Sequence, residues 1–433
     1  MSHDDNQSRL SSSTHSSWSS DSSTWWDDWP PDFDGTGLFQ RLARDDADDP
    51  PLFRFDVRDV LREVEARLGS AVVDIPKVGK GSNYFGMHMR LADDRDILAR
   101  VARLDVNWPK YGEGRADEFV DQQVTEVQFE ADVYDLLRQR REIFAANLLY
   151  YRAPVFSRST KHRRLPPGNL LGRALFLFEK TEGVNNVWPN DPEKRLQLLE
   201  QCARIRAALF SFALPPNFVS SWMTRRPPCA SSLSVDIAPT REFAIAFLAA
   251  KLDEAVLDSG SLTVALRARQ ILLQLIPLVM PSEGDQPDLY RLVLEHGDFG
   301  LHNMTITDAP SVTSLYDWES GHIVPAILSD PQMSIYVDLG IDGDGRPAIS
   351  RLWEGITDEE RTDYVCYAEH YYRILAEQEP RYLHAIKAGR DARHIWSALK
   401  SWRGEDHEQH LGELIPWAED RLAQVAIEGL HIL

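Results

Sequence analysis

The sequence predicts an α+β fold in two lobes, because strand patterns gather in the front of the chain and helix patterns in the back. Apolar and polar residues alternate over residues 84–91, and the apolar segment ILARVARL follows after a polar turn, so these two segments are predicted to pair as strands. After Gly183, long segments such as EKRLQLLEQCARIRAALFSF are typical of helices. Separate strand-rich and helix-rich parts favour the α+β class, and a length of 433 residues suits more than one lobe.

The composition excludes several classes of protein. Acidic residues outnumber basic residues by 67 to 47, and the formal net charge of −20 repels nucleic acid. The three cysteines, Cys202, Cys229 and Cys366, are far apart, which argues against a disulfide scaffold and favours a reducing compartment. The sequence has no apolar run of about 18 residues and no signal-peptide pattern at its start, so we expect a cytoplasmic protein without a membrane partner.

The chain divides into three segments. Residues 1–50 contain eleven serines and eleven aspartates but only three arginines, which gives them −8 of the net charge of −20. A segment of this composition cannot bury enough apolar surface to offset its ordering entropy, so we predict a disordered tail. Its tryptophans could contact a partner protein; they are Trp18, Trp25, Trp26 and Trp29. The N-lobe is expected over residues 51–182 and the helical C-lobe over residues 183–433.

The N-lobe elements follow from local patterns. PLFRFDVRDVLREVEARLG predicts a helix that ends at Gly69. VTEVQFEADVYDLLRQRR predicts an amphipathic helix, on which Glu130 shares a mostly apolar face with Tyr134. A carboxylate on that face needs a partner. LLYYRAPVFS and ALFLFEK predict two further strands.

The segment LVLEHGDFGLHNMTITDAPSVTSLYDWESGHIVP carries the candidate chemistry. It predicts three short strands, with His296, Asp298, Asn303 and Asp317 clustered on turns at their ends. Each residue alone could be an ordinary turn residue. Together they match phosphoryl transfer, which needs a carboxylate base and hard oxygen ligands for Mg²⁺. Asp298 is the predicted base, Asn303 and Asp317 are the predicted metal ligands, and His296 is expected to hold the loop by hydrogen bonds.

HGDFGLHN followed by YDWE resembles the catalytic and metal-binding loops of the aminoglycoside phosphotransferase family. That family's loop reads H-G-D-x-x-x-x-N and is followed by D-W-E or a similar segment, and both are matched without gaps. The resemblance extends over about residues 70–433. It implies a bilobal protein-kinase-like fold, with one helix on the N-lobe sheet and a mainly helical C-lobe, and it implies ATP and Mg²⁺ as cofactors.

The resemblance also implies a set of ATP-binding residues. GKGSNYFGMHM resembles the family's phosphate-covering loop, with Gly79, Gly81, Ser82 and Asn83. Glycines there allow backbone N–H groups to approach phosphate closely. ILARVAR resembles the strand that carries the nucleotide-binding cation, which is Arg100 in this chain. Protein kinases have lysine at this position, whereas arginine is common in fungal-type members of the family.

Two acidic residues complete the implied nucleotide site. The helical acid that pairs with Arg100 should be Glu130 or Glu126, and Glu130 is preferred because it lies on the apolar face of its helix. ALFLFEKTEG resembles the family's hinge strand, with Glu179 near the adenine pocket. The family's G-S-L segment after the first C-lobe helix is absent, and Ser220, Ser221 and Trp222 stand in its place.

The predicted function is ATP- and Mg²⁺-dependent phosphorylation of a hydroxyl group on a small molecule. An acidic C-lobe and many tryptophans suggest a cationic acceptor, such as an amino-alcohol or an aminoglycoside-like compound. The alternative is a catalytically weak or inactive kinase-like protein that binds a partner protein. Arg100 and the altered C-lobe motif are compatible with this alternative. A protein kinase is disfavoured, because no A-P-E-like segment follows D-W-E.

Overall fold

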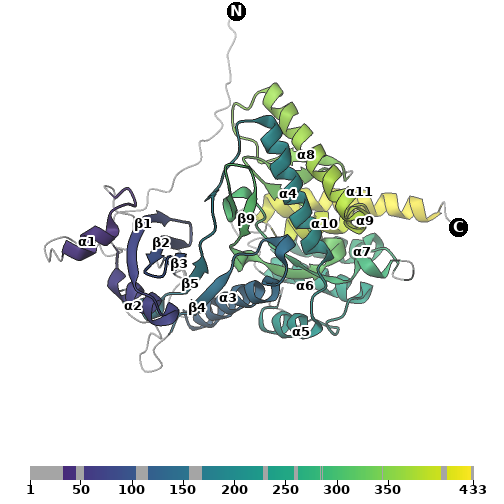
Figure 1. Ribbon diagram of the computed structural model, residues 1–433. Helices are drawn as coiled ribbons and strands as arrows, with labels where there is room; N and C mark the ends of the chain where they lie inside the picture. The colour runs from purple at the N-terminus through teal and green to yellow at the C-terminus, as the bar shows by residue number, and fades with distance from the viewer. Residues whose placement is uncertain are drawn as a thin grey trace, which may run out of the picture.

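The computed structural model describes residues 33–44, 53–103, 116–155, 168–227, 233–257, 262–282, 284, 286–343, 345–400 and 407–430. This part of the chain forms an N-lobe built on a sheet and a larger, mainly helical C-lobe (Figure 1). The α+β class and the two-lobed architecture predicted from the sequence are confirmed. None of the helices within these ranges is both long and apolar enough to cross a membrane.

The N-lobe sheet has five antiparallel strands in the order β1-β2-β3-β5-β4. The strands are β1 (Val72–Lys80), β2 (Tyr84–Leu91), β3 (Asp96–Ala102), β4 (Leu148–Arg152) and β5 (Leu175–Glu179). Two long helices accompany them, α2 (Val57–Leu68) and α3 (Ala116–Leu137). The end of α2 at Gly69 is confirmed; the backbone φ of 69° at this residue is left-handed, and glycine adopts it without strain.

A short helix precedes α2 within the range predicted as a tail. Helix α1 (Leu38–Arg44) packs on the N-lobe, where Phe33 and Leu38 are only 5% and 1% exposed. The N–H group of Val78 in β1 donates a hydrogen bond to the Gly35 carbonyl. Residues 33–44 therefore depart from the expected tail of residues 1–50, because their apolar side chains enter the core. The other residues of that predicted tail, including its four tryptophans, lie outside the described residues.

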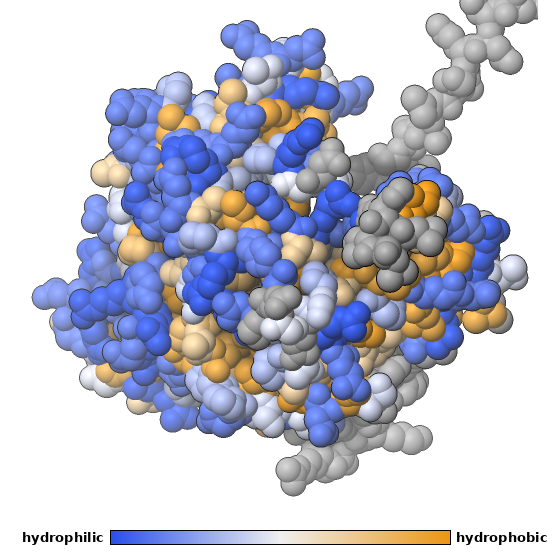
Figure 2. All heavy atoms as spheres, turned by 90° about the vertical axis from the view of Figure 1, so that its right-hand side faces the viewer, coloured by the Kyte–Doolittle hydropathy of each residue, from blue (hydrophilic) through white to orange (hydrophobic). Residues whose placement is uncertain are grey.

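The C-lobe contains most of the helices. They are α4 (Pro192–Ser211), α5 (Pro216–Arg225), α6 (Arg241–Leu257), α7 (Leu262–Val279), α8 (Asp358–Gln378), α9 (Pro380–Ala388), α10 (Arg390–Lys400) and α11 (His407–Leu430). The face of the molecule in Figure 2 is mainly hydrophilic, with smaller apolar areas between the polar residues. Such a surface is ordinary for a protein that buries its own core.

Short strands of the C-lobe position the candidate site. Strand β7 (Leu292–Glu295) pairs with β10 (His322–Pro325), and β8 (Met304–Ile306) pairs with β9 (Val312–Leu315) and β6 (Val184–Asn185). The three strands expected in the LVLEHGD, MTITD and VTSLYDW segments are therefore present. A smaller sheet consists of β11 (Met333–Ser334), β12 (Asp338–Ile341) and β13 (Pro347–Ser350).

Two hydrophobic cores support the fold. One core lies between the N-lobe sheet and helices α1 and α2, and it includes Leu175 and Leu177 of β5. Phe176 and Phe178 point to the opposite face of the same strand, where they join α3 and the C-lobe in a second, continuous core. Helix α3 thus packs between the sheet and the C-lobe, so residues on it can reach groups of both lobes.

Candidate active site

The loop after β7 gathers Asp298, His302 and Asn303 into one contact group. Nε2 of His302 lies 2.9 Å from Oδ2 of Asp298. The Asn303 amide donates hydrogen bonds to the backbone carbonyl of Asp298 at 2.9 Å and to its carboxylate at 3.2 Å. The hydrogen bond with His302 lowers the pKa of Asp298, and Asp298 in turn raises the pKa of His302. The Asp298 carboxylate is therefore held ionised at neutral pH, in a position fixed by its neighbours.

His296 supports this loop from inside the protein. Its side chain is fully buried, and Nε2 lies 3.0 Å from the carbonyl oxygen of Tyr316. Burial lowers the pKa of His296 to about 4, so the ring is neutral near pH 7. Its Nε2–H group then donates a hydrogen bond to that carbonyl. The His296 ring also packs 4.5 Å from the Trp318 ring. His296 thus links the loop after β7 to the segment that carries Asp317.

The pairing of β8 with β9 brings Asn303 and Asp317 to the same end of a two-stranded ribbon. Met304 is opposite Leu315, and the N–H of Tyr316 donates a 3.0 Å hydrogen bond to the Asn303 carbonyl. Asp317 follows directly, with a left-handed backbone φ of 72°. Its N–H donates a 2.9 Å hydrogen bond to the Tyr134 hydroxyl on α3, which holds this turn against the N-lobe helix.

Arg100 of β3 contacts carboxylates from both lobes. Its guanidinium group lies 3.4 Å from Glu130 on α3 and 3.0 Å from Asp317. The Tyr84 ring covers one face of the guanidinium at 4.3 Å. Burial opposes the charge on Arg100, but Asp317 and Glu130 outweigh that effect and raise its pKa well above the ordinary value. Glu126, one turn earlier on α3, instead accepts a hydrogen bond from Gln122.

Three carboxylates at the lobe junction form a group that could hold a metal ion. Oxygen atoms of Glu130, Asp317 and Glu319 lie within 4.8 Å of one another. Burial and the nearby Asp317 carboxylate raise the pKa of Glu130 to about 8 and the pKa of Glu319 to about 7. Oε2 of Glu130 is buried and has no hydrogen-bond partner in the described part of the chain. The carboxylates of Asp317 and Glu319 already accept contacts from Arg100 and Asn83, but all three side chains offer hard oxygen ligands of the kind that a divalent cation such as Mg²⁺ prefers.

The glycine-containing turn between β1 and β2 contacts the C-lobe. Gly81 donates a 2.8 Å hydrogen bond to the Tyr84 carbonyl, and a Cβ atom at Gly81 would lie only 3.0 Å from that oxygen. Arg103 donates to the carbonyls of Gly81 and Ser82 at 2.6 and 3.1 Å. The Asn83 amide donates to the Glu319 carboxylate. Gly79 belongs to β1 and pairs with Gly86 of β2, and a Cβ atom at Gly79 would meet nothing within 4 Å in the described part of the chain.

Glu179 lies apart from this group. It pairs with Ile97 on β3, whereas Arg100 pairs with Phe176, so Glu179 is about 10 Å farther along the strand. Its exposed carboxylate accepts a 2.8 Å hydrogen bond from Asn147. The structure therefore brings together Arg100, Glu130 and Asp317, and separates Glu179 from them.

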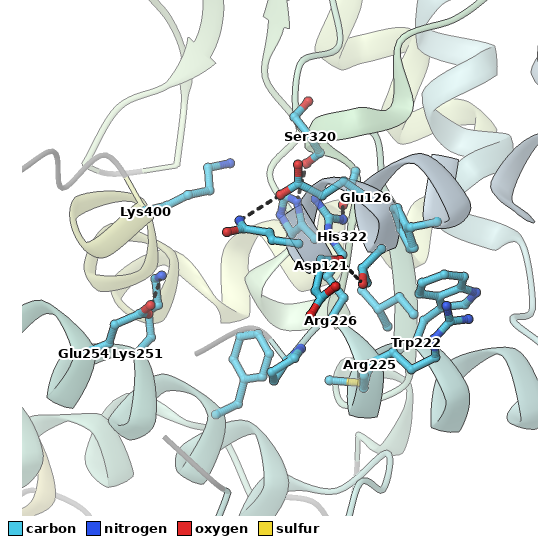
Figure 3. Close-up of a pocket in the computed structure, with 18 of the residues that line it drawn as sticks. Asp121, Glu126, Trp222, Arg225, Arg226, Lys251, Glu254, Ser320, His322 and Lys400 are labelled. Carbon is cyan, nitrogen blue, oxygen red and sulfur yellow. Dashed lines mark hydrogen bonds and ion pairs between the residues drawn. The ribbon is translucent and has the colours of Figure 1, made fainter. Parts of the chain in front are cut away.

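A cavity of about 660 Å³ adjoins the junction, between α3, α5, α6, α10 and the start of β10 (Figure 3). It lies beside Ser320 and Gly321, immediately after the Asp317–Glu319 segment. Lys400 lines this cavity and also a small cavity that contains Asp298. This volume is within the usual range of small-molecule sites.

No protein-family model and no curated protein matches this chain. Solved structures do match it. A macrolide 2'-phosphotransferase type I has 15% identity and a TM-score of 0.37, with 85% of this chain and 96% of that chain covered. A Plasmodium vivax ethanolamine kinase has 13% identity and a TM-score of 0.43, with 84% of each chain covered. An aminoglycoside phosphotransferase, solved with AMP-PNP and hygromycin B, has 13% identity and a TM-score of 0.40, with 86% of this chain and 98% of that chain covered.

The two-lobed α+β architecture expected from the sequence is present in the chain itself, whereas nothing in these matches supports the narrower expectation of a fungal-type member. Because identity and TM-scores are low, the function proposed below depends on residues of this chain.

Several residues of this site were not predicted from the sequence, namely Tyr134, Arg103, His302, Glu319 and Lys400. Glu319 had a local signal as the last residue of D-W-E, and Tyr134 had one on the helix face that it shares with Glu130.

Proposed function

We propose that this protein transfers the γ-phosphoryl group of ATP, with Mg²⁺, to a hydroxyl group of a small molecule. The observation that carries the proposal is the junction of the lobes, where Arg100 contacts both Glu130 and Asp317. Asn303 lies at the same end of the β8–β9 ribbon as Asp317 and contacts Asp298. These contacts support the proposal, because phosphoryl transfer needs a cation, oxygen ligands for the metal and a base in one site.

Asn303 and Asp317 are the proposed metal ligands, and Glu319 stands beside them. When bound, Mg²⁺ would neutralise charge on the phosphate oxygens. The donors fit this ion, because a carboxamide and carboxylates are hard oxygen ligands. Arg100 would place its charge at the phosphates, and its 3.4 Å contact with Glu130 would keep the guanidinium in position.

The end of β1 and the turn that follows it are the proposed cover of the phosphates, with Gly79 on the strand and Gly81, Ser82 and Asn83 in the turn. Arg103 binds two carbonyls of this turn and so fixes its shape. The N–H of Gly81 already donates to the Tyr84 carbonyl, so in this proposal the N–H groups of Ser82 and Asn83 would turn to the phosphates. Glu179 is proposed only as a neighbour of the adenine pocket, because its carboxylate is engaged by Asn147.

Asp298 is the proposed general base. Its hydrogen bonds with His302 and Asn303 lower its pKa and fix its carboxylate, so it is ionised and able to accept a proton. In the proposed step the acceptor hydroxyl loses its proton to Asp298 while its oxygen bonds to the γ-phosphorus, and the bond to the bridging oxygen of ADP breaks. Positioning and charge stabilisation would supply most of the rate.

Asp298→Asn tests this mechanism. The amide keeps the shape of the side chain but cannot take the proton, so we expect ADP formation with an accepted substrate to fall by about 100-fold or more. Binding of Mg·ATP, followed by thermal shift, should survive because Asp298 is not a proposed metal ligand. A purified Asp298→Asn protein that keeps the full rate would rule the mechanism out.

A kinase-like binding protein remains the second candidate, favoured by one contact. Arg100 already engages the proposed metal ligand Asp317 at 3.0 Å, so a metal ion would have to share that carboxylate with a guanidinium. This candidate predicts that Mg·ATP stabilises the protein no more than ATP with a chelator. The phosphotransferase predicts a clearly larger thermal shift with Mg·ATP.

A further inference from the structure

Arg206 is a buried cation that the proposed mechanism does not use. It stands on α4 and is only 5% exposed, and an arginine side chain stays protonated inside a protein. Within the described residues its guanidinium makes no hydrogen bond and no ion pair, and its Nε atom is buried. A buried charge without a hydrogen-bonded partner costs free energy, so Arg206 is not explained as a stabilising residue.

Arg206 lies against the loop that carries the candidate base. Its guanidinium is 5.1 Å from the centre of the Phe299 ring, which is within the range of a cation–π interaction. Phe299 directly follows Asp298 and is 4% exposed, and its ring meets the His296 ring edge to face at 6.1 Å. The Asp298 side chain is 52% exposed. The loop therefore has Arg206 on its buried side and presents the candidate base to solvent.

The small cavity that Arg206 and Asp298 both line is too small for an acceptor. Its volume is about 40 Å³, far below that of an ordinary small-molecule site. Two other carboxylates of its lining have cationic partners: Glu295 lies 2.8 Å from His322, and Asp330 lies 3.8 Å from Lys400. The cavity thus supports the loop from below, and in the described chain the contact of Arg206 with the loop is the one with the Phe299 ring.

Helix α4 supports the other end of the loop as well. Cys202 lies one turn before Arg206, and its Sγ is 3.7 Å from the sulfur of Met304. Met304 begins β8 directly after Asn303. Residues four apart on a helix share a face, so one face of α4 contacts both ends of the segment that runs from Asp298 to Asn303. A side chain at position 206 can therefore set where the Asp298 end of this segment lies.

We propose that Arg206 is a positioning residue for the candidate base and that it acts through the Phe299 ring. Its cation holds the ring, the ring fixes the start of the loop, and the loop aims the Asp298 carboxylate at the acceptor hydroxyl. The part played by Asp298 rests on the proposed function, whereas the support of the loop rests on the contacts alone. A displacement of about 1 Å near a reacting group costs up to about 100-fold in rate, so such a contact affects the reaction without touching the acceptor.

Arg206→Met separates positioning from general stability. Methionine keeps an apolar side chain and removes the buried charge, so the denaturation midpoint should not fall. We expect kcat for Mg·ATP hydrolysis, in which water replaces the acceptor hydroxyl, to fall about tenfold, while KM for ATP changes by less than about twofold. In the protein without nucleotide, the amides of residues 297–303 should exchange with deuterium several-fold faster, because the loop is held less firmly.

Arg291→Met is the matched control. Arg291 also lies over a phenylalanine ring, 4.3 Å from that of Phe210 on α4, but it donates a hydrogen bond to the Phe210 carbonyl. Loss of this hydrogen bond should lower the denaturation midpoint and leave kcat and the exchange of residues 297–303 unchanged. The two arginine variants therefore have opposite expected effects on stability and on the loop.

Phe299→Leu and the double variant test the route of the effect. If Arg206 acts through Phe299, Phe299→Leu should lower kcat by a similar factor, and the double variant should lose no more than either single variant. Losses that multiply in the double variant would overturn the proposal, as would wild-type kcat and wild-type exchange in Arg206→Met.

Two further outcomes keep the result decisive. If Arg206→Met does not fold, unchanged kcat and unchanged exchange in Phe299→Leu would overturn the proposal in its place. A wild-type protein that forms no ADP would contradict the proposed function, and deuterium exchange would still decide whether Arg206 holds the loop.

Discussion

The single hydroxyl group of Tyr134 joins the two lobes. It donates a 3.2 Å hydrogen bond to Glu130 and accepts a 2.9 Å hydrogen bond from the N–H of Asp317. The side chain is only 1% exposed, and its ring meets Phe178 edge to face at 4.9 Å. Because Glu130 pairs with Arg100 and Asp317 is a proposed metal ligand, this hydroxyl connects the proposed phosphate cation to the proposed metal site.

Tyr134→Phe removes this connection and keeps the ring. The half-buried N–H of Asp317 and the buried Glu130 carboxylate then each lose a hydrogen-bond partner, which should lower the free energy of unfolding by about 1–3 kcal/mol. We also expect Mg²⁺ to raise the affinity for an ATP analogue several-fold less than it does in the wild-type protein, because the turn at Asp317 is held less firmly. The measurement is a titration with the metal. Tyr150→Phe is the matched control, since its hydroxyl contacts Glu63 in the N-lobe at 3.2 Å. Equal changes in Mg²⁺ affinity for both variants would assign Tyr134 a structural role only.

At the level of elements, local patterns predicted the strands of the site, and contacts between distant elements were not predictable. The apolar runs before and after HGD indicated β7, β8 and β9, and their turns placed Asn303 and Asp317 at strand ends. The contact between Tyr134 and Asp317 joins residues 183 positions apart in the sequence. Periodicity shows which face of a helix is apolar, but it does not show which turn of another lobe that face will meet.

Helix α1 is an ordered segment within a range whose average composition predicts disorder. Its seven residues follow a stretch rich in serine and aspartate, so the average over residues 1–50 predicts disorder. A helix of that length is unstable alone and depends on packing. Phe33 and Leu38 supply that packing by entering the core of the N-lobe sheet.

Leu38→Ala measures what α1 contributes. Leu38 is 1% exposed, so the truncated side chain should lower the free energy of unfolding by about 2–4 kcal/mol in a denaturant titration. Gln40→Ala, at an exposed position of the same helix, is the control and should change it by less than about 0.5 kcal/mol. Unchanged stability of the Leu38 variant would show that α1 does not contribute to the fold.

At the scale of the whole molecule, the boundary between the lobes contains both tightly packed apolar side chains and buried ionisable groups. Helix α3 belongs to the N-lobe in sequence, yet it shares a continuous core with the C-lobe helices. The division at residue 182 predicted from the sequence therefore does not coincide with a division of the cores. The same boundary buries Arg100 and Glu130 and brings Asp317 and Glu319 beside them, so ionisation there should affect the stability of both lobes together.

The stability of the metal-free protein should accordingly fall as the pH rises from about 5 to 8. Burial and neighbouring carboxylates raise the pKa of Glu130 to about 8 and that of Glu319 to about 7, above the ordinary value of 4.5. Within this window the folded protein binds protons that the unfolded chain has released, so each group makes the free energy of unfolding fall by at most about 1.4 kcal/mol per pH unit.

Two variants test this assignment. Glu130→Gln should flatten the pH profile of stability between pH 7 and 8. Glu377→Gln, on the exposed surface of α8, is the control for the general effect of losing one carboxylate. Saturating Mg²⁺ should stabilise the wild-type protein more at pH 8 than at pH 6, because ligation requires ionised carboxylates. A profile that is flat in the metal-free protein and insensitive to Glu130→Gln would contradict the assignment of buried, interacting carboxylates at the junction.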